Sequence, residues 1–385
     1  MTLVLSNGRI LTPSGVVEGK ALAIRDGRIL AVLDAADLPL GARRYDLGGG
    51  LLVPGFIDTQ VNGGGGVLFN DDTSVEAIAA IGAAHRPYGT TGFLPTLISD
   101  DLSVVDAAMR AVEQAIDAGV PGVLGIHIEG PFLATRRKGI HDAGKFRILD
   151  DEAVDLLGSL RRGKTLVTLA PETTTPQMIS RLVRAGVIVA AGHTDADYAV
   201  VRRALDAGLT GFTHLFNAMS PLTSREPGVV GAALESKTAW CGLIVDGRHV
   251  NPVTLRLALA TRPLDRFMLV TDAMPTVGLA NKSFVLQGRT IRVENGVCVD
   301  AEGTLAGCDL DMASAVRNAT TMLDLSIEDA VAIASHSPAA FLGLADERGA
   351  IVPGLAADLV LLDEALQVRE AWIAGESATH LARLG

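Results

Sequence analysis

The sequence predicts an α/β fold, a (β/α)8 TIM barrel carrying a small β-sandwich domain built from the N- and C-terminal segments. From about residue 51, apolar runs of strand length alternate with segments of helical period, eight times in about 290 residues. Toward both ends of the chain, short apolar runs are instead separated by turn residues. We therefore expect one half of the sandwich at 1–53, the barrel at 54–344 and the other half of the sandwich at 345–385. A doubly wound open sheet is the alternative, but it does not require eight units.

The predicted sandwich begins with two tight turns. Asn7-Gly8 and Asp26-Gly27 each lie between apolar runs, and an Asx-Gly pair in that setting is a strong signal for a β-hairpin. Near the C-terminus, residues 357–363 and 368–373 are apolar runs of the same kind. This similarity indicates that both ends of the chain contribute to one sandwich.

The barrel strands are predicted in order from the apolar runs. They are expected at Leu51–Thr59, Thr91–Ile98, Val123–Glu129, Thr165–Ala170, Val187–His193, Gly211–His214, Trp240–Asp246 and Phe267–Asp272. Capping residues mark several of the helices between them, such as Thr73 in a capping box with Glu76, and Thr175 before Pro176. After the eighth strand, 284–286 and 290–293 flank Gln287-Gly288, which predicts a hairpin inserted before the last helices.

Composition excludes several classes of partner. The chain has 385 residues, 48% of them hydrophobic, so a large buried core is expected. Its net charge of −11 argues against nucleic acid and anionic membranes as partners, and any anionic ligand must be held by a few placed cations. Three cysteines without a CxxC pair indicate a reducing compartment. We find neither a signal peptide nor an apolar run long enough to span a membrane, so we expect a cytoplasmic enzyme.

Four predicted strands end on side chains suited to a metal site. Active-site groups of a parallel barrel project from the C-terminal ends of its strands. Glu129, His193 and His214 end strands three, five and six, and this ligand set suits Zn²⁺ or Fe²⁺ with a position left open for water. Asp272 ends strand eight and is left to transfer protons. A single histidine at a strand end would more often be structural. Packing alone hardly explains four titratable side chains at four strand ends, because unpaired buried titratable groups cost free energy.

The remaining histidines have simpler interpretations. His127 shares a strand face with Glu129, so it is either a further ligand or an interior barrel residue, and we favour the second. His85 precedes Arg86-Pro87 and is interpreted as a helix C-terminal cap. His336 and His380 have no evident partner and are expected to be structural or solvated.

Several segments carry a family resemblance. Residues 54–58, 127–132 and 191–193 resemble the amidohydrolase superfamily. Residues 213–221, 225–228, 246–250, 270–273 and 305–307 are similar to its N-acetylglucosamine-6-phosphate deacetylase family, and the likeness extends in order to about Asp363. The resemblance implies a metal-dependent enzyme that cleaves the acetamide of N-acetylglucosamine 6-phosphate to glucosamine 6-phosphate and acetate, in amino-sugar catabolism and cell-wall sugar recycling. The rival hypotheses are a deacetylase of N-acetylgalactosamine 6-phosphate, a hydrolase of N-acyl D-amino acids, and a barrel that binds metal or sugar without turnover.

The chain departs from much of the superfamily in its metal ligands. Where many members carry His-x-His after strand one, this chain has Gln60 and Asn62, which are poor ligands beside imidazole. Strand four offers no lysine within 165–172 to become a bridging carbamate. We therefore expect one divalent metal per subunit, Zn²⁺ before Fe²⁺ or Co²⁺, in place of a binuclear centre.

The resemblance also implies roles for individual residues. Asp272 would be the catalytic base, and His141 would stabilise the oxyanion together with the metal. Arg225 and His249 would bind the phosphate and, in this family, can serve the neighbouring active site, which implies a homodimer. The full set of implied substrate contacts is Ile140, Asn217, Ala218, Arg225, Asp246, Gly247, Arg248, His249, Leu305, Ala306 and Gly307.

Three features leave alternatives open. Without its motif, Arg225 would be interpreted as a surface ion pair with Glu226. The glycine run 63–66 is expected to be mobile. Met274-Pro275 is bulkier than the small residues typical of the family at this point. Either of the last two features could tune the choice between gluco and galacto epimers.

Overall fold

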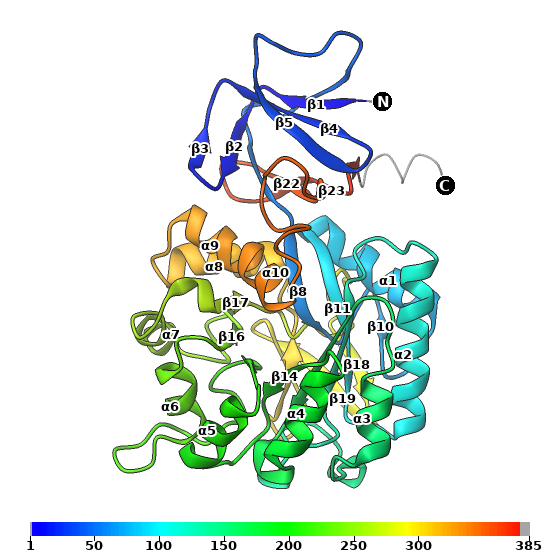
Figure 1. Ribbon diagram of the computed structural model, residues 1–385, viewed down its shortest axis with the longest axis vertical. Helices are drawn as coiled ribbons and strands as arrows, with labels where there is room; N and C mark the ends of the chain where they lie inside the picture. The colour runs from blue at the N-terminus through cyan, green and yellow to red at the C-terminus, as the bar shows by residue number, and fades with distance from the viewer. Residues whose placement is uncertain (1, 378–385) are drawn as a thin grey trace.

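The computed structural model describes residues 2–377, and it confirms the predicted barrel with a small β domain at one end (Figure 1). The barrel sheet holds eight parallel strands that are neighbours in chain order. They are β8 (Phe56–Val61), β11 (Thr90–Ile98), β12 (Gly125–Glu129), β13 (Lys164–Leu169), β14 (Ile188–Ala191), β15 (Gly211–Phe212), β16 (Trp240–Leu243) and β17 (Phe267–Leu269).

The first and last barrel strands are joined just beyond their ends. Thr271 Oγ1 donates to Asp58 Oδ2 over 2.5 Å, and the Thr271 amide donates to Asp58 Oδ1 over 3.3 Å. Val61 and Ala273 form a parallel bridge. These contacts bring the end of β17 against β8, so the groups after β17 and β8 face the same space as those after the other strands.

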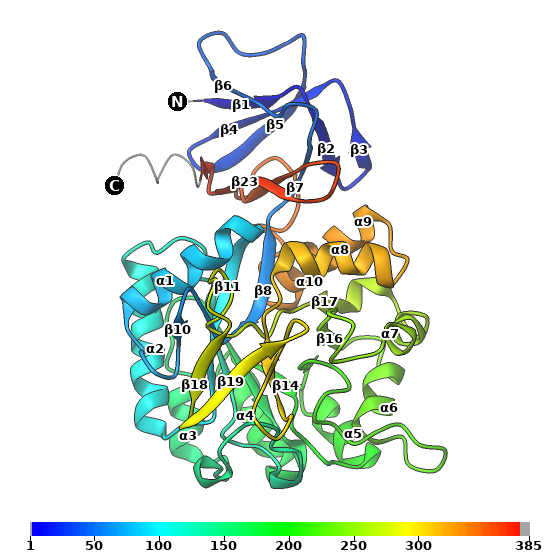
Figure 2. The ribbon, with the colours of Figure 1, turned by 180° about the vertical axis from the view of Figure 1, so that it is seen from behind.

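Helices surround the barrel (Figures 1 and 2). They are α1 (Val75–His85), α2 (Leu102–Asp117), α3 (Asp151–Leu157), α4 (Pro176–Arg184), α5 (Tyr198–Asp206), α6 (Gly228–Glu235), α7 (Pro252–Leu259), α8 (Met312–Met322), α9 (Ile327–Ala334) and α10 (His336–Phe341). Thr175 caps α4 as predicted, accepting from the Met178 amide. At α1 the cap is Ser74, not Thr73, because the Ser74 hydroxyl is the one placed to accept from the Ala77 amide.

The small domain consists of two sheets built from both ends of the chain. One sheet has the order β5 (Arg28–Asp34), β4 (Lys20–Arg25), β1 (Leu3–Ser6), β6 (Arg43–Asp46). The other has the order β24 (Glu376–Ser377), β23 (Val368–Ile373), β22 (Leu359–Leu362), β7 (Leu51–Pro54), β2 (Arg9–Thr12), β3 (Gly15–Val17). Antiparallel pairing of β7 with β22 joins the two ends. Their shared core includes Leu22, Leu52 and Trp372.

The first predicted barrel strand is two strands in the structure. β7 belongs to the small domain, β8 belongs to the barrel, and Gly55 separates them. The Gly55 amide donates to the Asp358 carbonyl, and a Cβ at this position would lie 2.0 Å from Thr91 Oγ1. The continuous apolar run hides this junction because both strands are buried.

The segment after β17 is larger than the predicted hairpin. It is a four-stranded antiparallel sheet of β18 (Ser283–Leu286), β19 (Arg289–Glu294), β20 (Val297–Val299) and β21 (Leu305–Cys308), partly visible in Figure 2. The Cys308 amide donates to the Asp272 carbonyl, and the Met274 amide donates to the Cys308 carbonyl. These bonds place β21 beside the end of β17.

The glycine run for which we predict mobility forms part of a small hairpin. β9 (Gly63–Gly64) pairs with β10 (Val67–Leu68), and the amides of Gly65 and Gly66 donate to the carbonyls of Val277 and Pro275. The run therefore packs against the segment that follows β17. Within residues 2–377, no helix has the length and apolar character needed to cross a membrane.

Candidate metal-dependent active site

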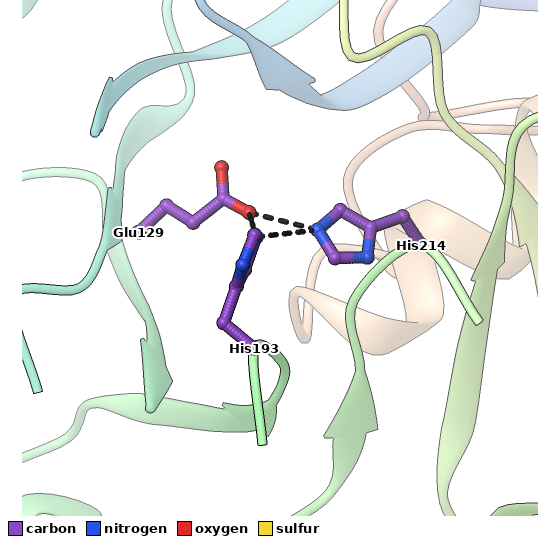
Figure 3. A group of neighbouring side chains, drawn as sticks. All are labelled: Glu129, His193 and His214. Carbon is purple, nitrogen blue, oxygen red and sulfur yellow. Dashed lines mark hydrogen bonds and ion pairs between the residues drawn. The ribbon is translucent and has the colours of Figure 1, made fainter. Parts of the chain in front are cut away.

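The structure brings the three predicted metal ligands together. Glu129 is the last residue of β12, whereas His193 and His214 lie two residues beyond the ends of β14 and β15. Glu129 Oε1 lies 3.1 Å from His193 Nε2 and 2.9 Å from His214 Nε2, and the two nitrogens are 3.1 Å apart (Figure 3). All three side chains are buried. Three ligand atoms thus converge on one point at the C-terminal end of the barrel.

The backbone turns sharply at the functional residues. His193, His214 and Asp272 have φ angles of +49°, +32° and +52°, in the left-handed region that side chains other than glycine seldom adopt. Such conformations cost free energy and tend to cluster at functional sites. Because the chain turns here, each side chain points to the centre instead of continuing the strand alternation.

The chemistry of the ligand set fits a cation. His193 Nδ1 lies 2.9 Å from the Arg137 carbonyl, so Nδ1 carries the proton and a neutral ring leaves Nε2 with a lone pair. That lone pair faces the Glu129 carboxylate, so two acceptors point at each other. Burial raises the pKa of Glu129, but hydrogen bonds from His193 and His214, which these rings can donate only when Nε2 carries a proton, outweigh burial and lower that pKa well below its ordinary value. A divalent metal would satisfy all three ligands.

The side-chain amides of Gln60 and Asn62 hold Asp272. Asn62 Nδ2 donates to Asp272 Oδ1 over 2.7 Å. Gln60 Nε2 lies 3.1 Å from the same oxygen and 3.2 Å from Glu129 Oε2. Burial and the Glu129 charge raise the pKa of Asp272 to about 6. From the sequence, Gln60 and Asn62 are recognisable only as poor ligands, because nothing local signals that they reach Asp272, more than two hundred positions away.

His141 reaches the site from the loop after β12, where Ser99 sets its tautomer. The Ser99 amide, which can only donate, lies 3.3 Å from His141 Nδ1, and Ser99 Oγ lies 2.8 Å from it. The proton of the neutral ring is therefore on Nε2. Burial lowers the pKa of His141 to about 3. The ring packs edge-on against His193, 4.4 Å between centroids.

A cavity of about 380 Å³ opens over these residues. Most of the predicted substrate contacts line it: Ile140, Asn217, Ala218, His249, Leu305, Ala306 and Gly307. Gly307 has a φ of +76°, and a Cβ there would lie 2.8 Å from the Asp272 carbonyl oxygen, so this position requires glycine. Arg136, Arg137 and Met274 also line the cavity, and the sequence analysis did not select the two arginines.

Three predicted contacts do not line this cavity. Asp246, Gly247 and Arg248 are absent from the described lining. The Asp246 carboxylate accepts from the amides of Arg248 and His249 at 2.8 Å, and His249 Nδ1 lies 2.6 Å from its Oδ2. Burial raises the pKa of Asp246, but the bond to His249 and the other contacts outweigh it and lower that pKa to about 2. Asp246 thus orients His249 instead of facing the cavity itself.

Arg225 lies outside this cavity. It is exposed on the loop before α6, and within residues 2–377 no ion pair joins it to Glu226. The Glu226 carboxylate instead accepts from the amides of Tyr198 and Gly228. The surface ion pair considered as an alternative is therefore not formed, and one chain alone does not bring Arg225 to its own site.

Three further described histidines lie outside the cluster of predicted metal ligands. His127 lies 2.7 Å from Thr168 Oγ1 in the barrel interior, the interpretation we favoured. His85 is buried at the end of α1, but its ring bonds to the Gly63 carbonyl, so the predicted cap is wrong. The Gly63 carbonyl belongs to the β9 hairpin, which sequence spacing could not place there. His336 is exposed, as expected, and His380 lies outside the described residues.

Comparisons with known proteins agree with this architecture. The amidohydrolase family matches residues 51–380. The chain belongs to the amidohydrolase family. Among relatives of this amidohydrolase, N-acetylgalactosamine-6-phosphate deacetylase of Shewanella sp. (strain ANA-3) is 44% identical, with 97% of this chain and 95% of the relative covered. N-acetylglucosamine-6-phosphate deacetylase of Haemophilus influenzae is 36% identical, with 96% and 97% covered.

This amidohydrolase is also similar to solved structures of N-acetylglucosamine-6-phosphate deacetylases. N-acetylglucosamine-6-phosphate deacetylase from Pasteurella multocida superposes with a TM-score of 0.95 at 35% identity, covering 98% of this chain and 99% of the other. A variant of the Mycobacterium smegmatis deacetylase, in complex with N-acetyl-D-glucosamine-6-phosphate, gives 0.88 at 34% identity with the same coverage. The likeness therefore includes the small domain as well as the barrel.

Proposed function

We propose that this amidohydrolase hydrolyses the acetamide of N-acetyl-D-glucosamine 6-phosphate to D-glucosamine 6-phosphate and acetate, in amino-sugar catabolism and cell-wall sugar recycling. The observation that carries the proposal is the convergence of Glu129, His193 and His214 beside Asp272, at the base of one cavity. The names of the Haemophilus and Pasteurella relatives support the substrate.

One divalent cation per chain would be held by Glu129 Oε1, His193 Nε2 and His214 Nε2. Zn²⁺ suits this mixed nitrogen and oxygen set best, with Fe²⁺ and Co²⁺ as alternatives. Such a cation supplies Lewis acidity, which lowers the pKa of water and polarises an amide carbonyl.

The protein's own side chains would handle the protons. Both amides donate to Asp272 Oδ1, which leaves Oδ2 to accept the proton of the attacking water. Asp272 would then pass that proton to the departing amine, because an amide anion is a very poor leaving group. His141, with its proton on Nε2, would donate a hydrogen bond to the developing oxyanion.

Residues that line the cavity around the predicted metal ligands would recognise the substrate. Asn217 and Ala218 would contact the sugar phosphate, while His249, oriented by Asp246, would act as a further donor. The Leu305–Gly307 segment would close over the acetyl group, where small residues suit a short acyl chain. Arg225 would serve the neighbouring active site of a homodimer, since it does not reach its own. We place the enzyme in the cytoplasm.

N-acetylgalactosamine 6-phosphate is a second candidate substrate. The Shewanella relative, 44% identical, is named for that activity. The two sugars differ only at C4, so the phosphate and acetamide contacts proposed above apply to both. An epimer preference would have to arise from other contacts in the cavity.

An acetate-release assay tests both candidates. The enzyme is stripped with a chelator, reloaded with Zn²⁺, Fe²⁺ or Co²⁺, and supplied with each N-acetylhexosamine 6-phosphate and, separately, with N-acyl D-amino acids. The proposal expects metal-dependent acetate release from the gluco epimer. Faster turnover of the galacto epimer would favour the second candidate, and turnover of N-acyl amino acids alone would contradict both.

A further inference from the structure

Two arginines supply the positive charge at the mouth of the active-site cavity. Among the described residues that line this cavity, only Arg136 and Arg137 carry a permanent positive charge. Both lie in the short 3-10 helix Thr135–Arg137, in the loop after β12. Cations here are notable because the whole chain has a net charge of −11. This pair therefore supplies the permanent positive charge that the described cavity lining offers to an anionic ligand.

Asp195 holds both guanidinium groups. Arg137 Nε donates to Asp195 Oδ1 over 2.8 Å, and an Arg136 terminal nitrogen lies 3.2 Å from Asp195 Oδ2. The Arg136 side chain is 86% exposed and that of Arg137 is 34% exposed, so both can still reach a ligand in the cavity. Two guanidinium groups thus share one carboxylate.

The loop that presents the arginines is tied to the catalytic centre. The Arg137 carbonyl bonds to His193 Nδ1, and the Ala134 amide donates to the His193 carbonyl over 3.0 Å. These bonds set the distance between the guanidinium groups and the metal ligands. A ligand anchored by the arginines would therefore be held at a defined position relative to Glu129 and Asp272.

The same edge adjoins the segment that the proposed function assigns to the sugar phosphate. Thr194, the neighbour of Asp195, donates its amide to the Ala218 carbonyl over 3.0 Å. Asn217 and Ala218 line the cavity together with Arg136 and Arg137. The two guanidinium groups and the Asn217–Ala218 backbone thus border the same side of the cavity.

We propose that Arg136 and Arg137, presented by Asp195, bind the phosphomonoester of the substrate from within the same chain and make the enzyme selective for phosphorylated sugars. This inference rests on the proposed function. Arginine suits the role because its planar fork can donate two hydrogen bonds to one phosphate. Arg225 of a partner subunit would then add to an anion site that each chain already possesses.

The experiment compares N-acetylglucosamine 6-phosphate with unphosphorylated N-acetylglucosamine as substrates of the metal-loaded enzyme. R136Q and R137Q are measured beside R161Q, a control that removes a similarly exposed guanidinium paired with Glu113. We expect each cavity variant to raise KM for the phosphorylated sugar by about tenfold or more, the loss typical of a hydrogen bond to a charged group. The ratio of kcat/KM between phosphorylated and plain sugar should fall equally, because the plain sugar makes no such contact.

Further measurements separate the alternative explanations. Metal content per chain shows whether R137Q has disturbed His193. R136Q should fold normally, because the Arg136 side chain is mostly exposed. Inhibition by glucosamine 6-phosphate should weaken in both variants, while R161Q behaves like wild type. An unchanged selectivity ratio in R136Q and R137Q, especially beside a collapse of that ratio in R225Q, would overturn the inference. If the wild type releases no acetate from any hexosamine 6-phosphate, the proposed function itself fails.

Discussion

Asn62 Nδ2 lies 2.7 Å from Asp272 Oδ1, across 210 positions of the chain. Gln60 donates to the same oxygen and also reaches Glu129 Oε2. Two side-chain amides therefore connect the predicted metal ligand Glu129 to the predicted base Asp272.

We expect Asn62→Ala to lower kcat by roughly tenfold, because Asp272 loses its shortest hydrogen bond and with it a fixed orientation. Metal content should remain near one ion per chain, since Asn62 contacts none of the three ligands. Steady-state acetate release and elemental analysis measure the two quantities. Asn281→Ala, on an exposed residue of the inserted segment, is the control. A large loss of metal in the Asn62 variant would contradict a role limited to Asp272.

Asp272→Asn should reduce acetate release by about 10²- to 10⁴-fold, the range for removal of a general base. The amide can no longer accept a proton, although it fills nearly the same volume. Bound metal should be largely retained because Asp272 is not among the ligands. If the substituted enzyme kept its activity, another residue would have to be the base.

Asp246→Asn should mainly raise KM. The carboxylate that fixes His249 is weakened, whereas the metal ligands and Asp272 are untouched. We expect a rise of about tenfold, the usual scale for one charge-assisted hydrogen bond. Substrate-saturation curves for Asp246→Asn and for an Asp309→Asn control separate KM from kcat. A fall in kcat at constant KM would show that Asp246 acts on the chemical step.

The same substitution should also change the acid sensitivity of the fold. The pKa of Asp246 is about 2 in the folded chain, against an ordinary value of 3.8. A lowered folded-state pKa contributes stability that is present above about pH 4 and is lost as pH falls toward 2. Asp246→Asn should lower the free energy of unfolding by at most about 2 kcal/mol above pH 4, and by less as the pH approaches 2. Urea unfolding at several pH values measures this difference, and a gap that widens on acidification would be the wrong sign.

Chelation of the metal should abolish acetate release and lower the melting temperature. Without a cation, the lone pair of His193 Nε2 faces the Glu129 carboxylate at 3.1 Å, which is an unfavourable contact in a buried site. Adding one equivalent of Zn²⁺ should restore both properties, because binding to the folded state alone stabilises it. Calorimetry with and without Zn²⁺ tests this, and restoration that requires two equivalents would contradict a single-metal centre.

Much of the fold could be predicted from the sequence because its signals are local. The Asx-Gly turns and the eight apolar runs identified the sandwich and the barrel. The junction at Gly55 could not be predicted, because β7 and β8 are both buried and read as one apolar run. The four-stranded insertion was only half predicted, since β20 has three residues and the apolar run of β21 is interrupted by a glycine.

The residue types at the strand ends can be read directly from the amino-acid sequence. In a parallel barrel those ends must meet, so Glu129, His193, His214 and Asp272 could be grouped without coordinates. The neighbours of these four side chains depend instead on how distant segments fold together. Gln60 reaches both acids, Asp246 turns toward His249, and Arg136 and Arg137 lie at the cavity mouth while Arg225 does not. These contacts join distant segments through sharp turns and loops, and no local periodicity encodes where such side chains point.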